Sequence, residues 1–358
     1  MAAKVCCYSY KGLTFNRGLY YRFVQMTLTH PVKYLCIFLC IWLVSCTEVQ
    51  KKPEISQSVT AEGTVTAALS DTSALAAFSS TTSGIVVQDV TKGAPLFRLS
   101  HQDPVTNLVT LLNFSSDGQF LVSADLRHVG LWQLSDGKNL GFWSMQEGIT
   151  VRDIAVSAQG KHIVIAQNDG KIQHITLKTG RRLEFLGHTR DVNAVDHNVN
   201  SVAISPNGRY VLSGGNDYKS YLWDSETGQV LHSFTHPSRV IKVALDNQGR
   251  FLFSADSRKQ AEIYDVRTGN KISQLQIERS MSFSAARFSD DGKWLITGSP
   301  AQQVVIWDVA TGKRVHEWLV TPNPNSRPAN ALVYDVAFST QGQPVTVSSV
   351  GLVELWKP

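Results

Sequence analysis

Residues 200–228, NSVAISPNGRYVLSGGNDYKSYLWDSETG, contain three short apolar runs separated by turn residues. The runs are Val202–Ile204, Tyr210–Leu212 and Tyr221–Trp223. Each run is too short for a helix and is bounded by glycine, asparagine or proline, which is typical of antiparallel strands joined by tight turns. The stretch therefore predicts three consecutive β-strands.

The same pattern recurs along the chain, and the residue that ends the third strand is a convenient landmark. These landmarks are spaced 41 to 49 residues apart. They fall at Gln88, Trp132, Ile175, Trp223, Tyr264, Trp307 and Trp356. A period of about 40–45 residues with four strands in each unit indicates a β-propeller. We predict an all-β fold, a seven-bladed β-propeller of four-stranded antiparallel blades.

The last copy ends with its third strand, close to Trp356, and so lacks a fourth strand. The segment around Ile55 to Thr60 precedes the first copy and is free to supply that strand. Pairing of the N-terminal and C-terminal strands would remove the open seam between the first and last blades. We therefore expect the ring to be closed in this way.

Four short motifs resemble those of the WD-repeat family: Leu222–Asp224, Ile306–Asp308, Ile263–Asp265 and Gly187-His188. The resemblance implies a hydrogen-bonded tetrad of His, Ser or Thr, Asp and Trp in each blade. Only the fourth copy is expected to hold all four, because the fifth has Arg258 at the expected Asp position. We interpret the set as buried structural staples, with a catalytic His-Ser-Asp role as the alternative. Its members are His188, Ser213, Asp217 and Trp223.

The N-terminal segment reads as a targeting signal. Residues 1–45 contain five basic and no acidic residues and end in the apolar run Tyr34–Val44. Eleven apolar residues are too few for a membrane span and are typical of a signal peptide. Leu43–Cys46 resembles the bacterial lipobox, which implies that Cys46 is acylated after removal of residues 1–45. Met26 is an alternative start of the protein. We expect residues 46–53 to form a lipidated tether and residues 54–358 to form the propeller.

Thr47 follows the cysteine that is expected to carry the lipid. In lipoproteins of bacteria with two membranes, an aspartate at this position tends to retain the protein in the inner membrane. The resemblance therefore implies an outer-membrane lipoprotein that faces the periplasm. Several acyl chains, such as palmitate, would anchor it firmly.

Composition excludes several classes of function. The whole chain has 34 basic and 29 acidic residues, but without the first 45 residues the two numbers are equal at 29. A nucleic-acid binder needs a basic excess on its folded domain, so this partner class is rejected. All five cysteines lie within the first 46 residues, and no nucleotide-binding or zinc-protease motif is present. We expect no cofactor, no metal and no enzymatic activity.

Two long connections between blades carry the candidate partner-binding residues. The first holds Arg190, Asp191, Asp196 and His197, and the second holds Asn323, Asn325 and Arg327. Loops on a rigid scaffold are common binding sites, and both connections should emerge on one side of the disc.

The function predicted from these features is a non-catalytic protein–protein interaction platform, held at the membrane by its lipid. Its partners would be envelope proteins of unknown identity. The alternative is an enzyme or small-ligand sensor with a site in the central channel. Its candidate residues are mixed in charge and lie near the turns between second and third strands: Asp125, Arg127, Asn168, Asp169, Asn216, Asp217, Asp256 and Arg258.

Overall fold

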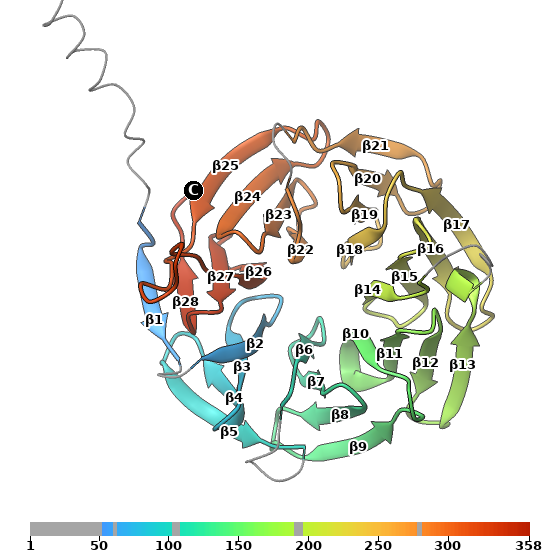
Figure 1. Cartoon of the computed structure of the whole chain (residues 1–358), viewed down its shortest axis with the longest axis horizontal. Helices are drawn as coiled ribbons and strands as arrows, with labels where there is room; N and C mark the ends of the chain where they lie inside the picture. Colours follow the sequence, from blue (N-terminus) through green and yellow to red (C-terminus); the bar gives the residue numbers. More distant parts are fainter. Residues whose placement is uncertain (1–51, 60–62, 102–107, 190–195, 278–280) are drawn as a thin grey trace, which may run out of the picture. The chain divides into compact units, whose positions relative to one another are not determined.

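The computed structural model describes residues 52–59, 63–101, 108–189, 196–277 and 281–358. These residues form seven four-stranded antiparallel sheets arranged as a ring, together with the short 3-10 helices η1 (Ala158–Gly160) and η2 (Gly187–Thr189) (Figure 1). The prediction of an all-β, seven-bladed propeller is confirmed. The predicted signal peptide and Cys46 lie outside the described residues.

We number the blades in chain order, and each runs from its innermost to its outermost strand, except that the outermost strand of blade 7 is β1. Blades 1 to 3 contain β2 (Thr64–Leu69), β3 (Leu75–Ser80), β4 (Gly84–Asp89) and β5 (Ala94–Leu99); β6 (Leu111–Phe114), β7 (Phe120–Ala124), β8 (His128–Gln133) and β9 (Asn139–Ser144); and β10 (Val151–Val156), β11 (His162–Gln167), β12 (Ile172–Thr176) and β13 (Arg181–Phe185). Blades 4 and 5 contain β14 (Val199–Ile204), β15 (Tyr210–Gly215), β16 (Lys219–Asp224) and β17 (Val230–Thr235); and β18 (Val240–Leu245), β19 (Phe251–Asp256), β20 (Ala261–Asp265) and β21 (Lys271–Gln274). Blades 6 and 7 contain β22 (Ala285–Phe288), β23 (Trp294–Gly298), β24 (Gln303–Asp308) and β25 (Arg314–Leu319); and β26 (Val333–Phe338), β27 (Pro344–Ser348), β28 (Leu352–Leu355) and β1 (Ile55–Ser58).

Burial along a strand depends on its place in the blade. The second strand β15 is almost entirely buried, because neighbouring blades cover both of its faces. The outermost strand β9 alternates between half-buried and exposed residues, because one face meets solvent. This difference explains why inner strands are continuously apolar and outer strands are mixed.

Each seam between neighbouring blades has its own apolar cluster. At the seam between blades 3 and 4, for example, Val164 and Val211 are fully buried, and Phe185 stacks on Trp223 with ring centroids 4.5 Å apart. A ring of small cores allows about 300 residues to fold without one large centre.

The closing strand is β1, which pairs antiparallel with β28 in the register Ile55↔Leu355 to Ser58↔Leu352. Trp356 directly follows β28, is fully buried, and donates its indole N–H to Thr346 Oγ1 at 3.0 Å. The prediction that the two ends of the propeller pair with each other is therefore confirmed.

Candidate functional site: the loop face and the central channel

The strand order gives the disc two different faces. Strands alternate in direction, so the connections from one blade to the next emerge on the same side as the turns between second and third strands. We call this side the loop face. It contains the described residues of the connections 59–63, 100–110, 145–150, 186–198, 236–239, 275–284 and 320–332, and the turns 81–83, 125–127, 168–171, 216–218, 257–260, 299–302 and 349–351. The other side, with the remaining turns, is the turn face.

The polar set of blade 4 lies under the loop face. His188 Nδ1 lies 2.8 Å from Asp217 Oδ1, and His188 Nε2 lies 2.9 Å from Ser213 Oγ. Trp223 does not join these bonds: its indole nitrogen has no hydrogen-bond partner within the described ranges, and its ring stacks on Phe185. His188 and Ser213 are fully buried, so a substrate has no access to this Asp-His-Ser arrangement, and it serves to hold the turn in place.

Blade 2 contains a second set of this kind. His101 Nε2 lies 2.7 Å from Ser123 Oγ, Trp132 Nε1 donates to the same oxygen at 2.8 Å, and His101 Nδ1 lies 3.5 Å from Asp125 Oδ2. The prediction that only the fourth copy holds all four residue types is therefore wrong. Asp125 also accepts backbone hydrogen bonds from Arg127 and His128, and although burial opposes the effect, these bonds and His101 lower its pKa.

Spacing explains why the sequence did not reveal this set. The aspartate lies four residues after the serine in blade 4, where Asp217 follows Ser213, but only two residues after it in blade 2. Blade 5 shows the shorter spacing as well, since Ser254 is followed by the buried Asp256 and bonds to His236 Nε2 at 2.8 Å. The two-residue spacing therefore places Asp256, and not Arg258, at the aspartate position of blade 5. Among the described residues, however, His236 Nδ1 and Asp256 Oδ2 have no hydrogen-bond partner.

The first long connection is held against blade 4 by amides. Asp196 Oδ2 accepts hydrogen bonds from Asn198 Nδ2 at 2.7 Å and from Asn216 Nδ2 at 2.8 Å. Asn200 Nδ2 then donates to Asn216 Oδ1 at 2.6 Å and to the Val240 carbonyl of the next blade at 2.7 Å. Although burial opposes the shift, the Asn198 backbone amide and the Asn216 and Asn198 side-chain amides lower the pKa of Asp196.

Three further candidates belong to this connection, and the structure describes only one of them, His197. His197 Nδ1 lies 3.3 Å from the His188 carbonyl oxygen, which places the ring against the root of the connection. Arg190 and Asp191 lie outside the described residues.

The second long connection is ordered by its own hydrogen bonds. Asn323 Oδ1 accepts from the Asn325 amide at 2.9 Å, the Asn323 amide donates to the Asn330 carbonyl at 3.0 Å, and Ser326 Oγ accepts from the Asn330 amide at 3.0 Å. Asn325 and Arg327 are exposed on this frame. The two candidate connections share the loop face but belong to different blades.

Sequence reasoning missed Tyr218, which lies in the turn before β16. Its side chain is 52% exposed and its backbone is left-handed, with φ of +66°. Such a φ is sterically costly for any residue with a Cβ. Blade 3 has Gly170 at the equivalent position. Comparison of the copies could therefore have shown that Tyr218 stands where another blade has glycine.

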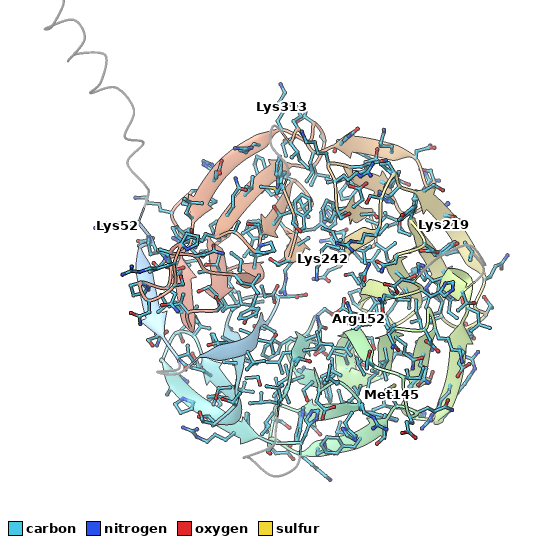
Figure 2. All side chains as sticks on the ribbon, viewed as in Figure 1. Lys52, Met145, Arg152, Lys219, Lys242 and Lys313 are labelled. Atoms are coloured by element: carbon cyan, nitrogen blue, oxygen red, sulfur yellow. The ribbon has the colours of Figure 1, made fainter. Side chains whose placement is uncertain are left out.

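Side chains occupy the central channel. The cavity there measures only about 140 Å³ and is lined by residues of the innermost strands and their turns, including Asn113, Lys242, Asn247 and Arg287. Lys242 points toward the centre of the ring, whereas Lys219 lies at its rim (Figure 2). None of the eight residues suggested for a channel site lines this cavity.

One end of the channel is bridged by polar contacts. Asn247 of blade 5 donates to Asp71 Oδ2 of blade 1 at 2.6 Å, and Arg287 Nη1 lies 2.7 Å from Asp71 Oδ1. Arg287 Nη2 lies 2.9 Å from Asp335 Oδ2, which also accepts the Leu69 amide at 2.9 Å. Because Asp71 and Asn247 lie in turns of the turn face, the channel is obstructed on that side.

In the described part of the chain, no group of three or more His, Cys, Asp or Glu side chains is arranged to hold a metal ion. Within the same residues, no helix is long and apolar enough to cross a membrane.

Comparison with known proteins supports the repeat assignment. The model of the family "WD domain, G-beta repeat" matches residues 93–133, 180–224 and 277–308. Protein LST8 homolog from Drosophila melanogaster is 27% identical over 157 residues, which cover 44% of this chain and 48% of that protein. Small ribosomal subunit protein RACK1 from Caenorhabditis elegans is 30% identical over 133 residues, which cover 37% of this chain and 36% of that protein.

A third relative is Actin-interacting protein 1 from Caenorhabditis elegans, 28% identical over 116 residues that cover 32% of this chain and 16% of that protein. The chain thus spans about half or less of the length of these relatives. The three matched segments each include a landmark tryptophan, namely Trp132, Trp223 and Trp307. The chain is therefore a seven-bladed propeller that carries WD repeats and has WD-repeat relatives.

Proposed function

We propose that this chain is a lipid-anchored, non-catalytic platform that binds other proteins of the cell envelope through its loop face. The observation that carries the proposal is Tyr218, a half-exposed aromatic in a left-handed turn on that face. Tyrosine is enriched among residues that dominate binding energy at protein interfaces. Residues held in a sparsely populated backbone conformation cluster at functional sites, and a glycine would relieve the strain here.

The second long connection adds a preorganised surface. The hydrogen bonds of Asn323, Ser326 and Asn330 fix the loop before any partner arrives. A prefixed loop lowers the entropy that binding must remove. Exposed Asn325 and Arg327 would then offer polar contacts at little ordering cost.

The channel alternative ranks second for a physical reason. Asp71, Asn247 and Arg287 bridge one end of the channel, and the remaining cavity is below the roughly 300 Å³ of a typical ligand pocket. A ligand in the channel would have to displace these contacts.

The proposed anchor is a lipid on Cys46, which would hold the ring close to the outer membrane on its periplasmic side. Support comes from the sequence, in which the lipobox-like Leu43–Cys46 is followed by Thr47 and a polar segment. Strand β1 begins at Ile55, nine residues after Cys46. A chain of that length reaches at most about 30 Å, so partners would have to meet the ring near the membrane surface.

The platform is tested by cross-linking in intact cells, purification of the tagged protein and mass spectrometry. We expect one abundant envelope partner that is lost from Tyr218→Gly and from a variant with loop 321–331 shortened. The control is Lys293→Ala on the turn face, which should retain the partner. Equal recovery from the loop-face variants and the control would contradict the proposal, as would the absence of any partner above background.

The anchor is tested separately by acyl labelling and fractionation. Cys46→Ala should abolish incorporation of labelled palmitate, and Thr47→Asp should move the protein from the outer to the inner membrane fraction. Labelling of Cys46→Ala at the wild-type level would refute the lipid anchor without bearing on the loop face. Unchanged fractionation of Thr47→Asp would refute the outer-membrane assignment alone.

A further inference from the structure

The seam between blades 7 and 1 is built differently from its neighbours. At three other seams, the landmark aromatic of one blade packs against an aromatic of the outermost strand of the preceding blade. The ring centroids are 4.5 Å apart for Phe185 and Trp223, and 4.1 Å apart for Phe234 and Tyr264. Trp318 and Trp356 form a similar pair at 6.1 Å. These aromatic pairs fill the outer part of each seam.

Blade 1 has Gln88 at the landmark position, and its preceding strand is the polar β1, Ile55–Ser58. The apolar cluster of this seam includes Phe78 and Val353, and the partly buried Val59 packs against it. Beyond it lies an open crevice of about 510 Å³. The crevice occupies the outer part of the seam, where the three seams described above hold an aromatic pair.

The crevice has the size and lining of a small-molecule site. Typical ligand pockets measure about 300–1,000 Å³ and combine apolar walls with a few polar groups. Its apolar walls are Val59, Val86 and Pro95, and its polar groups include Ser80, Gln88 and Arg98. The Gln88 Nε2 group is buried and has no hydrogen-bond partner among the residues that the structure describes.

Charge restricts the kind of ligand. Arg98 lies directly opposite Val86 on the neighbouring strand, so both side chains are on the face of blade 1 that lines the crevice. Arg98 is exposed, and among the residues that the structure describes it forms no ion pair and shares the crevice with no carboxylate. A single unopposed guanidinium favours an anionic ligand, and its planar fork suits a carboxylate.

We propose that this crevice binds a small aromatic carboxylate. The aromatic ring would occupy the space that a landmark tryptophan fills in other blades, between Val59, Val86 and Pro95. The carboxylate would pair with Arg98 at the open edge. Such a ligand would bridge blade 7 and blade 1, and so would stabilise the closed ring.

The test uses indole-3-acetate and neutral indole as probes of the purified full-length protein, with binding measured by calorimetry. We expect indole-3-acetate to bind and Arg98→Gln to weaken it by about tenfold, as expected for loss of a charge-assisted contact. Indole should bind more weakly than indole-3-acetate and should be unaffected by Arg98→Gln. The exposed Arg267→Gln of blade 5 is the matched charge control and should bind like wild type.

Two filling variants locate the site. Gln88→Trp should restore an aromatic at the landmark position, raise the melting temperature and abolish binding. Pro95→Trp covers the crevice from the exposed strand β5 and should also abolish binding, whereas Leu96→Trp at the next exposed position should not. If Gln88→Trp fails to fold, the Pro95 and Leu96 pair decides the matter. Absence of heat with indole-3-acetate, or equal binding by Pro95→Trp and Leu96→Trp, would overturn the proposal.

Discussion

Arg287 of blade 6 and Asp71 of blade 1 form an ion pair across the position of blade 7, with Nη1 2.7 Å from Oδ1. Asp335 of blade 7 accepts the other guanidinium nitrogen at 2.9 Å, so a single side chain joins three blades beside the channel. Burial raises the pKa of Asp71, and the nearby guanidinium opposes this shift. The ring is thus closed on the inside by charge as well as on the outside by strand pairing.

Replacing Arg287 with Met should lower the free energy of unfolding by about 2–4 kcal/mol, because two largely buried carboxylates lose their cation. Urea denaturation monitored by circular dichroism measures the change. Lys293→Met, which removes a solvent-exposed pair with Asp291 at 3.7 Å, is the control and should cost no more than about 0.5 kcal/mol. Equal midpoints for the two variants would show that the inner contact does not hold the ring.

Deleting Leu352–Pro358 should abolish the cooperative thermal transition. The deletion removes β28, leaves β1 without a partner and takes away the buried Trp356. Removal of only Lys357 and Pro358, which are both exposed, is the control and should leave the melting temperature unchanged. A melting curve of the longer deletion that matched full-length protein would contradict closure by the terminal strands.

The buried His174 should make the protein acid-sensitive. Burial lowers its pKa to about 4, and both ring nitrogens lack hydrogen-bond partners beside the stacked His162. The unfolded chain takes up this proton near pH 6.5, whereas the folded chain does so only near pH 4, so stability falls as pH drops between these values. The loss should reach about 3 kcal/mol.

Urea denaturation of His174→Leu at pH 4.5 and pH 7 tests this sign. The variant should lose much less stability than wild type over this interval. Some dependence of its stability on pH should remain, because burial also lowers the pKa values of His162 and His236. An unchanged pH slope in the variant would mean that His174 does not titrate as described.

Two buried glutamates at equivalent positions should respond oppositely to replacement by glutamine. Burial raises the pKa of Glu354, whose hydrogen bonds come only from Thr321. Burial also tends to raise the pKa of Glu262, but the hydrogen bonds that it accepts from Tyr264, Gln260 and Lys271 outweigh this effect, so its pKa is lowered. Stability from Glu354 is therefore lost as pH rises through its folded pKa, and stability from Glu262 is lost as pH falls through its own.

Glu354→Gln should accordingly raise the midpoint of urea denaturation at pH 7.5 and flatten its decline above pH 5. Glu262→Gln should lower the midpoint and reduce the free energy of unfolding by about 1–3 kcal/mol, because Lys271 and Tyr264 lose a charged partner. Each variant is the other's control, since both substitutions conserve shape. A change of the same sign in both would contradict this account.

How far the sequence could lead depends on the range of each interaction. The strand pattern of residues 200–228 and the spacing of Trp223 from its equivalents are local, so they indicated the repeat, the blade number and the need for a closing strand. The turn that begins at Ser205 is an example of such a local signal. The Gly208 amide donates a hydrogen bond to the Ser205 carbonyl, and the φ of +78° at Gly208 favours glycine at this position of the repeat.

Contacts between distant copies could not be inferred in this way. The hydrogen bond of Asn247 to Asp71 joins residues of blades 5 and 1 whose separation in sequence carries no signal of their approach. The open crevice beside Gln88 also arises only when blade 7 meets blade 1. Periodicity by itself determined the ring of seven blades, because alternation and turns are local. The tertiary structure alone decided which polar groups are buried, which bridge the channel and where the ring is left unfilled, because each depends on side chains that closure brings together.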